Sequence, residues 1–296
     1  INFGKVIMKV FITGATGFIG RNLLRKLSSK FDITYALTRQ KRYSTILDKK
    51  IKYLIGDLQN INEFMREIES VDYFIHCGAE LNSKKSNLDL INIESTKKII
   101  KILKKKSNIK FVFFSSSTVL KKTYKTSYSN SKKEIDAYII SNLSNYLIIR
   151  PTWVIGKGSK SFINFLNHLK KFPFVPIIGS GKTKIAPIYL NDLVSFIMHL
   201  IDNDCRGIFY ASSQKKVSYK EFIIFTLKAL NLDKKTISLP IWLCIALSKY
   251  TSFLSKDALS DFLEEVYLPE NSLCTFNKFS LDYKQSIKKI IDTKEK

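Results

Sequence analysis

The sequence predicts an α/β fold: a doubly wound parallel sheet, followed by a small, mostly helical C-terminal lobe. In the first half of the 296 residues, six short apolar segments alternate with helical segments. The apolar segments are nearly continuous, which is typical of strands buried on both faces of a parallel sheet. Right-handed crossovers then place helices on both faces of that sheet. After Pro151 the alternation gives way to loops rich in proline and glycine.

The individual elements follow from apolar periodicity and from turn residues. We expect strands at 9–13, 33–38, 52–56, 72–77, 110–115 and 145–150, and a further strand at 207–212. Helices are expected near 18–30, 61–69 and 93–106 and from Ser127 onward. In the first of these, Leu23, Leu24 and Leu27 recur at helical spacing and define a buried side.

The second half predicts a smaller lobe. Residues 170–187 have the composition of loops. Residues 188–194 have the pattern of a short strand that enters a helix, and the tail from Ser218 is mostly helical. We therefore expect a nucleotide-binding domain at 8–155, to which 188–214 returns, a substrate-binding lobe at 156–187 and 215–296, and an extension at 1–7. The apolar segment 237–247 is too short to span a bilayer. It is either a wall of the small lobe or an amphipathic membrane contact.

The formal net charge of +24 raises nucleic acid as a partner, but the distribution of the lysines argues against it. Only seven of the 49 basic residues are arginine. The densest cluster, 96–106, surrounds an apolar helical stripe and indicates a solvated helix face. No specific nucleic-acid partner is expected, although a polyanion-binding protein stays an alternative. The four cysteines are scattered without metal-ligand spacing, which predicts free thiols, no metal site and a cytoplasmic location.

A glycine-rich turn lies between the first strand and the first helix. The segment "TGATGFIG" (13–20) spaces Gly14, Gly17 and Gly20 three residues apart. At this place glycines allow a tight turn and close approach of the backbone to a pyrophosphate at the helix N-terminus. The turn therefore predicts a dinucleotide cofactor.

The end of the second strand indicates which dinucleotide. A site selective for NAD places an acid there, to bind the ribose 2′-hydroxyl. Here the segment "LTRQKR" (37–42) has no acid. Arg39, helped by Lys41 or Arg42, is suited to a 2′-phosphate. We expect NADP(H), and NAD(H) stays possible.

Several motifs in the chain resemble those of one superfamily. They are "GDL" (56–58), "HCGA" (76–79), "IRPTWVIGKG" (149–158) and "IYLNDLV" (188–194). Together with the glycine turn they resemble the extended and atypical short-chain dehydrogenase/reductases, the NAD(P)-dependent epimerase/dehydratase family, which has a Rossmann fold. The resemblance implies a set of cofactor-binding residues: Gly14, Thr16, Gly17, Phe18, Ile19, Gly20, Arg39, Asp57, Leu58, Cys77, Gly78, Ala79, Ser115, Lys132 and Pro151.

The stretch "SYSNSKKE" (127–134) contains a candidate catalytic pair. Tyr128 and Lys132 are four residues apart, so they share one face of the helix expected here. A nearby ammonium favours the phenolate, which suits the tyrosine to proton transfer near neutral pH. The resemblance implies that Ser116, with Ser117 behind it, polarises the substrate oxygen. It also implies that Lys132 binds the nicotinamide ribose while Tyr128 exchanges a proton during hydride transfer.

Other features depart from that family pattern. Leu120 and Lys121 replace the usual tyrosine-glycine pair, and Ile185, beside Lys184, stands where an arginine for the sugar-nucleotide diphosphate is usual. These departures argue against an ordinary UDP- or dTDP-sugar as the substrate, although Lys182 and Lys184 are suited to bind a phosphate.

We therefore predict an NADP(H)-dependent oxidoreductase or epimerase, acting by hydride transfer on a carbohydrate-like, nucleotide-linked small molecule. The alternative is a non-catalytic NAD(P)H-binding accessory protein, resembling the nucleotide-binding subunit of respiratory complex I. The retained tyrosine–lysine pair favours the enzyme. Assembly stays open between monomer and homodimer, because lysines crowd the helix that would form a family dimer interface: Lys97, Lys98, Lys101, Lys104 and Lys105. His76 is expected to be structural or to lie near the cofactor.

Overall fold

The fold is described here from a computed structural model. The structure describes residues 7–40, 48–78, 88–247, 259, 263–269 and 282–292. The chain divides into two compact units, each of which is described by itself. Unit 1 comprises residues 1–115, 131–149 and 197–209, and unit 2 comprises residues 116–130, 150–196 and 210–296. The domain limits expected from the sequence stay a prediction.

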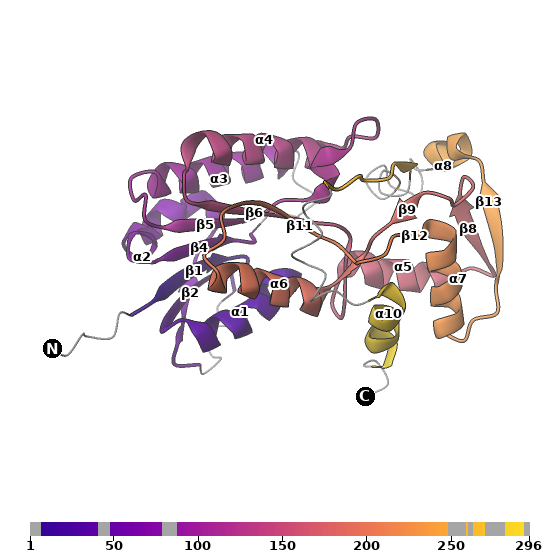
Figure 1. The fold of residues 1–296 in the computed structure, drawn as a ribbon, viewed down its shortest axis with the longest axis horizontal. Coiled ribbons are helices and arrows are strands. Elements are labelled where there is room, and N and C mark those ends of the chain that lie inside the picture. The colour runs from indigo at the N-terminus through magenta and orange to yellow at the C-terminus, as the bar shows by residue number, and fades with distance from the viewer. Residues whose placement is uncertain are drawn as a thin grey trace. The chain divides into compact units, whose positions relative to one another are not determined.

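A seven-stranded sheet organises the first half of the chain (Figure 1). In sheet order, its strands are β11 (Gly207–Ala211), β6 (Tyr146–Pro151), β5 (Lys110–Phe114), β4 (Tyr73–His76), β1 (Lys9–Thr13), β2 (Ile33–Thr38) and β3 (Ile51–Ile55). The pairs from β6 to β3 are all parallel. The strand order reverses between β1 and β4, where Thr13 pairs with His76. The doubly wound sheet is confirmed, and the reversal marks the edge at which such folds bind ligands.

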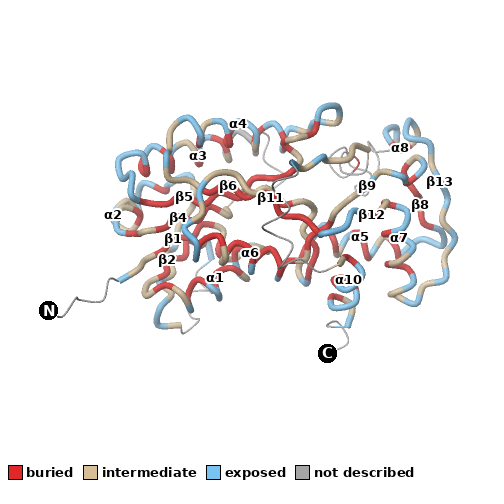
Figure 2. The backbone as a smooth tube through the Cα atoms, viewed as in Figure 1, coloured by how far each residue is buried: buried red, intermediate tan, exposed pale blue. Residues whose placement is uncertain are grey.

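Helices cover this sheet on both faces (Figure 1). Helix α1 (Phe18–Lys30) lies on one face, and α3 (Leu88–Leu103) and α4 (Ser127–Asn142) lie on the other. The short helices η2 (Leu58–Phe64) and α2 (Met65–Glu69) connect β3 to β4. Every residue of β4 and β5 is buried, as Figure 2 shows for the strands of the sheet. Burial on both faces explains why these strands read as continuous apolar runs.

The core of unit 1 is aromatic. Phe11 and Phe74 stack at 5.0 Å between ring centroids, and Phe111 and Phe113 stack at 6.1 Å. All four rings come from three neighbouring strands and are almost completely buried. Offset ring pairs of this kind stabilise a core beyond the area that they bury. The strands therefore hold their carboxyl ends in a fixed arrangement.

The described part of unit 2 contains three two-stranded sheets and a set of helices. The sheets pair β7 (Val154–Ile155) with β10 (Ile188–Tyr189), β9 (Lys184–Ile185) with β12 (Val217–Ser218), and β8 (Phe174–Ile178) with β13 (Lys235–Leu239). The helical elements are η3 (Ser117–Leu120), α5 (Lys160–Lys171), α6 (Leu190–Asp202, whose end lies in unit 1), α7 (Tyr219–Ala229), α8 (Ile241–Leu247) and α10 (Tyr283–Asp292). Trp153, Phe162, Phe165 and Phe222 pack together in its core.

The structure departs from the loop expected at 170–187. Residues 174–178 form β8, which pairs in parallel with β13 over five residues. Pro176 lies within β8 and has no N–H to donate. Among the described residues, β8 pairs with β13 alone, and a proline is tolerated in a strand that has an unpaired side. The proline-rich composition therefore predicted a loop where the chain forms strand β8.

Candidate active site

The glycine turn after β1 packs directly against the end of β4. Gly14 has φ +67°, in the region that favours glycine. A Cβ on Gly14 would lie 2.6 Å from the Gly78 nitrogen and 2.7 Å from the Cys77 carbonyl carbon. A Cβ on Gly20 would lie 2.1 Å from the Gly14 carbonyl oxygen. Gly14 and Gly20 are therefore required by the backbone packing of this turn.

The N-terminus of α1 follows this turn. Gly17 is the N-cap residue and supplies no side-chain cap, and the first turn of the helix contains no acid. The Gly17 N–H donates to the Gly14 carbonyl at 2.9 Å, which closes the turn. The initial N–H groups of a helix carry a partial positive charge and suit a phosphate. The bare backbone of this turn, where side chains would clash, fits a dinucleotide diphosphate.

His76 lies in a buried chain of hydrogen bonds that fastens the end of β4. Thr96 donates to the Asn92 carbonyl, so the His76 Nε2–H donates to Thr96 Oγ1 at 3.0 Å. His76 Nδ1 then accepts from Thr13 Oγ1 at 2.6 Å, and Thr13 Oγ1 accepts from the Gly78 N–H at 3.2 Å. Burial, and then the charge of Lys132, lower the pKa of His76 to about 3. His76 is therefore a neutral, structural residue that fixes Gly78 beside the glycine turn.

The ends of β2 and β3 bring two of the predicted cofactor residues together. The Arg39 guanidinium lies 4.0 Å from an Asp57 carboxylate oxygen, and its side chain is 61% exposed. The other Asp57 oxygen accepts from the Gln59 N–H at 3.0 Å and caps η2. Leu58 Cδ1 lies 3.1 Å from the position of a Cβ on Gly78. Arg39 is thus accessible beside Asp57, whereas Lys41, Arg42 and Ala79 lie outside the described residues.

Lys132 extends from α4 toward the same edge of the sheet. Its ammonium donates to the Phe114 carbonyl at 2.8 Å and lies 4.6 Å from the Phe113 ring centroid. Burial lowers the pKa of Lys132 to about 8, against the opposing charges of Asp136 and Cys77. Its electrostatic interactions with His76 and Cys77 place the ammonium near the end of β4.

Ser115 binds Asp136, which in turn interacts with Lys132. Its hydroxyl donates to Asp136 Oδ2 at 2.9 Å, and its N–H donates to the Ile149 carbonyl at 2.8 Å. Both Ser115 and Asp136 are buried. Because Asp136 also interacts with Lys132, Ser115 is positioned to orient the carboxylate that faces the ammonium. Pro151, the remaining predicted cofactor residue, ends β6.

Tyr128 is one helical turn before Lys132 on α4, in the part of that helix that belongs to unit 2. Its side chain is 41% exposed. A reciprocal pair of hydrogen bonds begins the helix: Thr126 N–H donates to Ser129 Oγ at 2.9 Å, and Ser129 N–H donates to Thr126 Oγ1 at 3.1 Å. This arrangement satisfies N–H groups that a helix start leaves unpaired. The phenol is therefore accessible on a well-formed helix end.

Ser116 lies directly after β5, at the N-cap of η3. Its Oγ accepts from the Thr118 N–H at 3.2 Å and from the Thr118 hydroxyl at 2.8 Å. A hydroxyl that accepts two bonds has its own proton left to donate in a third direction. Ser116 is thus chemically suited to donate to a substrate oxygen. Ser116 and Ser117 are both buried, at 9% and 3% exposure.

Glu264 was not predicted from the sequence as a residue of this site. Its Oε1 accepts from the Lys122 N–H at 2.7 Å, and its Oε2 accepts from the N–H groups of Thr123 at 3.0 Å and Tyr124 at 2.8 Å. Burial raises the pKa of the Glu264 carboxyl, but these donors and Lys121 outweigh it, so the net pKa is lowered. Glu264 therefore fixes the short segment that leads into the Tyr128 helix. No local pattern could reveal this contact, because about 140 residues separate the partners.

The chain belongs to the NAD dependent epimerase/dehydratase family, because the model of that family matches residues 10–209. The predicted membership and the prediction of an NAD(P)-dependent enzyme are confirmed. UDP-glucose 4-epimerase of Vibrio cholerae is 26% identical over 265 residues, which are 80% of each chain. Subunit 9 of the mitochondrial NADH dehydrogenase [ubiquinone] 1 alpha subcomplex of Arabidopsis thaliana is 24% identical over 212 residues, 67% of this chain and 51% of that protein.

Two solved structures show the same fold at low identity. The dTDP-glucose 4,6-dehydratase of Bacillus anthracis, in complex with NAD, has a TM-score of 0.75 at 16% identity and covers 97% of this chain and 96% of its own. A human epimerase family protein with NADPH has a TM-score of 0.71 at 18% identity and covers 96% of this chain and 99% of its own. A nicotinamide cofactor is therefore supported, and both nucleotides occur on this fold.

Proposed function

We propose that this protein is an NADP(H)-dependent oxidoreductase or epimerase that acts by hydride transfer on a carbohydrate-like, nucleotide-linked substrate. One observation carries the proposal: Tyr128 and Lys132 share α4, and the Lys132 ammonium interacts electrostatically with Cys77 at the end of β4. Cys77 in turn adjoins the Gly14 turn. A tyrosine–lysine pair retained on a chain of this family, next to the predicted cofactor turn, is expected of a working enzyme.

The residues of unit 1 would hold the cofactor as follows. The turn from Gly14 to Gly20 and the first N–H groups of α1 would bind the diphosphate. Asp57 and Leu58 would border the adenosine, and Lys132 would bind the nicotinamide ribose. When bound, a nicotinamide nucleotide supplies the hydride acceptor and donor.

The chain's own residues would handle the proton. Tyr128 would take a proton from the substrate hydroxyl as the carbon beneath it is oxidised, and would return a proton on reduction. Ser116 would donate a hydrogen bond to the same oxygen and orient it. The Lys132 ammonium would favour the phenolate form of Tyr128, which needs the lysine to be charged. Since the pKa of Lys132 is about 8, the lysine is mostly charged at neutral pH.

The substrate class is supported by similarity. The Vibrio cholerae relative is a UDP-glucose 4-epimerase, and solved structures of this fold include the dTDP-glucose 4,6-dehydratase. Lys184, exposed in β9, would bind a phosphate of the substrate, and Ile185 beside it cannot. We therefore propose a nucleotide-linked sugar held differently from the usual UDP- and dTDP-sugars, in a substrate lobe at 156–187 and 215–296.

The test of catalysis is the Tyr128→Phe variant. Turnover of nucleotide sugars, followed by absorbance of the reduced nicotinamide or by analysis of epimerised product, should fall by about a hundredfold or more. NADPH affinity should stay unchanged, because the phenol is assigned to the substrate. Undiminished turnover in Tyr128→Phe would contradict the proposal.

The test of cofactor choice is a fluorescence titration with NADPH and with NADH. In Arg39→Ala, NADPH binding should weaken by about tenfold, the loss expected for one charge-assisted hydrogen bond, while NADH binding should not change. Arg66→Ala is the matched control, since Arg66 is an exposed arginine in α2. If Arg39→Ala weakened the binding of NADPH and NADH equally, Arg39 would not be the residue that recognises the 2′-phosphate.

A second candidate function is a non-catalytic NAD(P)H-binding accessory protein. The similarity to the Arabidopsis complex subunit favours it. Under this alternative, NADPH would raise the thermal stability of the protein and Tyr128→Phe would alter no cellular function. Turnover lost in Tyr128→Phe with NADPH binding retained would exclude it.

A further inference from the structure

Helix α8 exposes an apolar face. Ile241 and Ile245 are each 41% exposed and Trp242 is 70% exposed, whereas Cys244 is buried against the core of unit 2. Positions 241, 242 and 245 share one side of a helix. Single exposed apolar residues need no explanation, but three that share one face are unusual. Figure 2 shows α8 as exposed along much of its length.

This face continues onto the sheet of β8 and β13. Strand β13 ends at Leu239, and α8 begins two residues later. A Cβ on Gly179, directly after β8, would lie 3.1 Å from Ile241 Cγ1. Phe174 and Ile237, each 44% exposed, lie on one side of this sheet, since Ile237 pairs with Pro176. We name these five residues the apolar surface: Phe174, Ile237, Ile241, Trp242 and Ile245.

The chain segments that form this surface contain lysines and lack acidic residues. Residues 160–184, which include β8, contain five lysines and no acid, and residues 234–247 contain two lysines and no acid. Lys171, Lys182 and Lys235 are exposed, and Lys235 pairs directly with Phe174 across the two strands. Asp233, directly before the second segment, is the acid closest in sequence. The segments that expose the apolar residues therefore carry positive charge.

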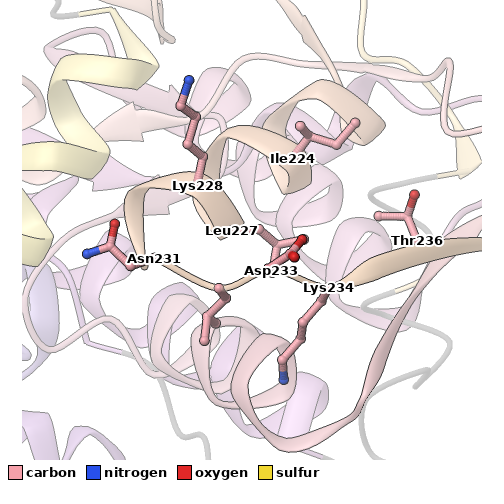
Figure 3. A pocket seen from close by; sticks show the side chains of 8 residues that line it. Ile224, Leu227, Lys228, Asn231, Asp233, Lys234 and Thr236 are labelled. Carbon is pink, nitrogen blue, oxygen red and sulfur yellow. The ribbon is translucent and has the colours of Figure 1, made fainter.

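A hollow of about 480 Å³ adjoins β13, and the lysines that line it do not converge on one point. It is lined by residues of α7 and of the segment that enters β13, among them Lys228, Asp233 and Lys234 (Figure 3). The figure shows the two lysines directed away from each other. The Lys234 ammonium instead donates to the carbonyls of Lys170 and Phe172, at 2.7 and 2.6 Å. The lysines thus supply a diffuse charge rather than a site for one anion.

We propose that the apolar surface docks the protein on the surface of an anionic lipid bilayer. Tryptophan and isoleucine side chains on a short helix partition into the boundary between headgroups and acyl chains, and surrounding lysines are attracted to anionic headgroups. A nucleic acid would match the lysines but would leave the apolar centre in contact with phosphates. The part of the chain that the structure describes contains no helix with the length and apolar character of a membrane span.

Vesicle binding by the full chain tests this proposal. The protein should co-float with vesicles of phosphatidylcholine and phosphatidylserine, bind pure phosphatidylcholine weakly, and release at high salt. Trp242→Ser should weaken binding to the anionic vesicles by about tenfold. Ile140→Ser is the matched control, because Ile140 is a 44% exposed isoleucine on α4 outside the apolar surface. It should bind like the unmodified protein.

A charge variant and a spectroscopic readout complete the test. Lys171→Glu combined with Lys235→Glu should abolish the preference for phosphatidylserine while leaving the thermal unfolding temperature unchanged. In the unmodified protein, tryptophan emission should shift to shorter wavelength on vesicle addition, and Trp242→Ser should lose that shift although Trp153 remains. Three results would each overturn the proposal: equal binding to both vesicle types, Trp242→Ser binding like Ile140→Ser, or a self-association that Trp242→Ser abolishes without any vesicle binding.

Discussion

At the scale of single residues, His76 shows how a titratable side chain can stabilise the fold without taking part in proton transfer. Both of its ring nitrogens are used inside the molecule, by Thr13 and Thr96. A proton on Nδ1 would end the hydrogen bond that Nδ1 accepts from Thr13, and burial penalises the charge. The residue was expected to be structural or near the cofactor. Its contacts make it structural.

This arrangement predicts a loss of stability in acid. The pKa of His76 is lowered to about 3, whereas an unfolded histidine titrates near 6.5. Between these values the unfolded chain binds a proton that the native protein does not, so stability falls as the pH drops from about 6.5. The slope should be about 1.4 kcal/mol per pH unit for this one group.

Urea unfolding at pH 7 and pH 5 measures that slope. His76→Asn removes the titration, so its free energy of unfolding should depend less steeply on pH by about one proton. His199→Asn, at a half-buried histidine of α6, is the matched substitution for comparison. An unchanged slope in His76→Asn would show that another group carries the acid sensitivity.

At the scale of elements, the start of α4 depends on a residue far along the chain. Glu264 accepts three consecutive backbone N–H groups from residues 122–124, and the Thr126–Ser129 pair then begins the helix. Tyr128 comes only twelve positions after Ser116, so this segment is short. A carboxylate that binds this short segment fixes where the helix starts.

Glu264→Gln should therefore destabilise the protein by about 1 kcal/mol at pH 7, because an amide offers one acceptor oxygen where the carboxylate offers two. The pKa of Glu264 is lowered, so its contribution is present above the carboxyl's ordinary pKa and is lost as the pH falls through the folded pKa. Thermal unfolding at pH 7 and pH 3.5 checks both statements. Glu265→Gln, which removes the 2.6 Å ion pair with Lys216, is the control. A difference that persisted undiminished in acid would contradict the role of the charge.

At the scale of the whole molecule, the charges on α3 bear on assembly. Lys97 pairs with Glu134 of α4 at 2.9 Å, and Lys104 donates to Asn142 of α4 at 3.2 Å. These contacts are made within one chain, between α3 and α4. Burying the lysines in a second copy would break the pairs and desolvate the charges.

We expect a monomer of 34.1 kDa. Analytical ultracentrifugation at micromolar concentration should give one species of that mass, at low and at high salt. Lys101→Glu, which reduces the positive charge of α3, should not change the result. A dimer that dissociates in Lys101→Glu would show that acids of a second copy meet this helix.

The parts of the fold that sequence alone could predict are those with local signals. The seven strands of the main sheet were placed within one or two residues, because burial on both faces leaves continuous apolar runs. The Gly14 turn and the Tyr128–Lys132 spacing are likewise local patterns, each contained within one strand-to-helix connection or one helix. The sequence by itself therefore determined the doubly wound sheet, the family and the choice of candidate residues.

Tertiary structure alone decided what joins distant segments. The pairing of β8 with β13, the hydrogen bonds of Glu264 to residues 122–124 and the network around His76 connect residues that are between about 20 and 140 positions apart. The exposure of Trp242 was decided there too, since an apolar helix reads the same whether its face is covered or not. Periodicity records which side chains prefer burial, but hydrogen-bond partners and covering surfaces are chosen only when the chain folds back on itself.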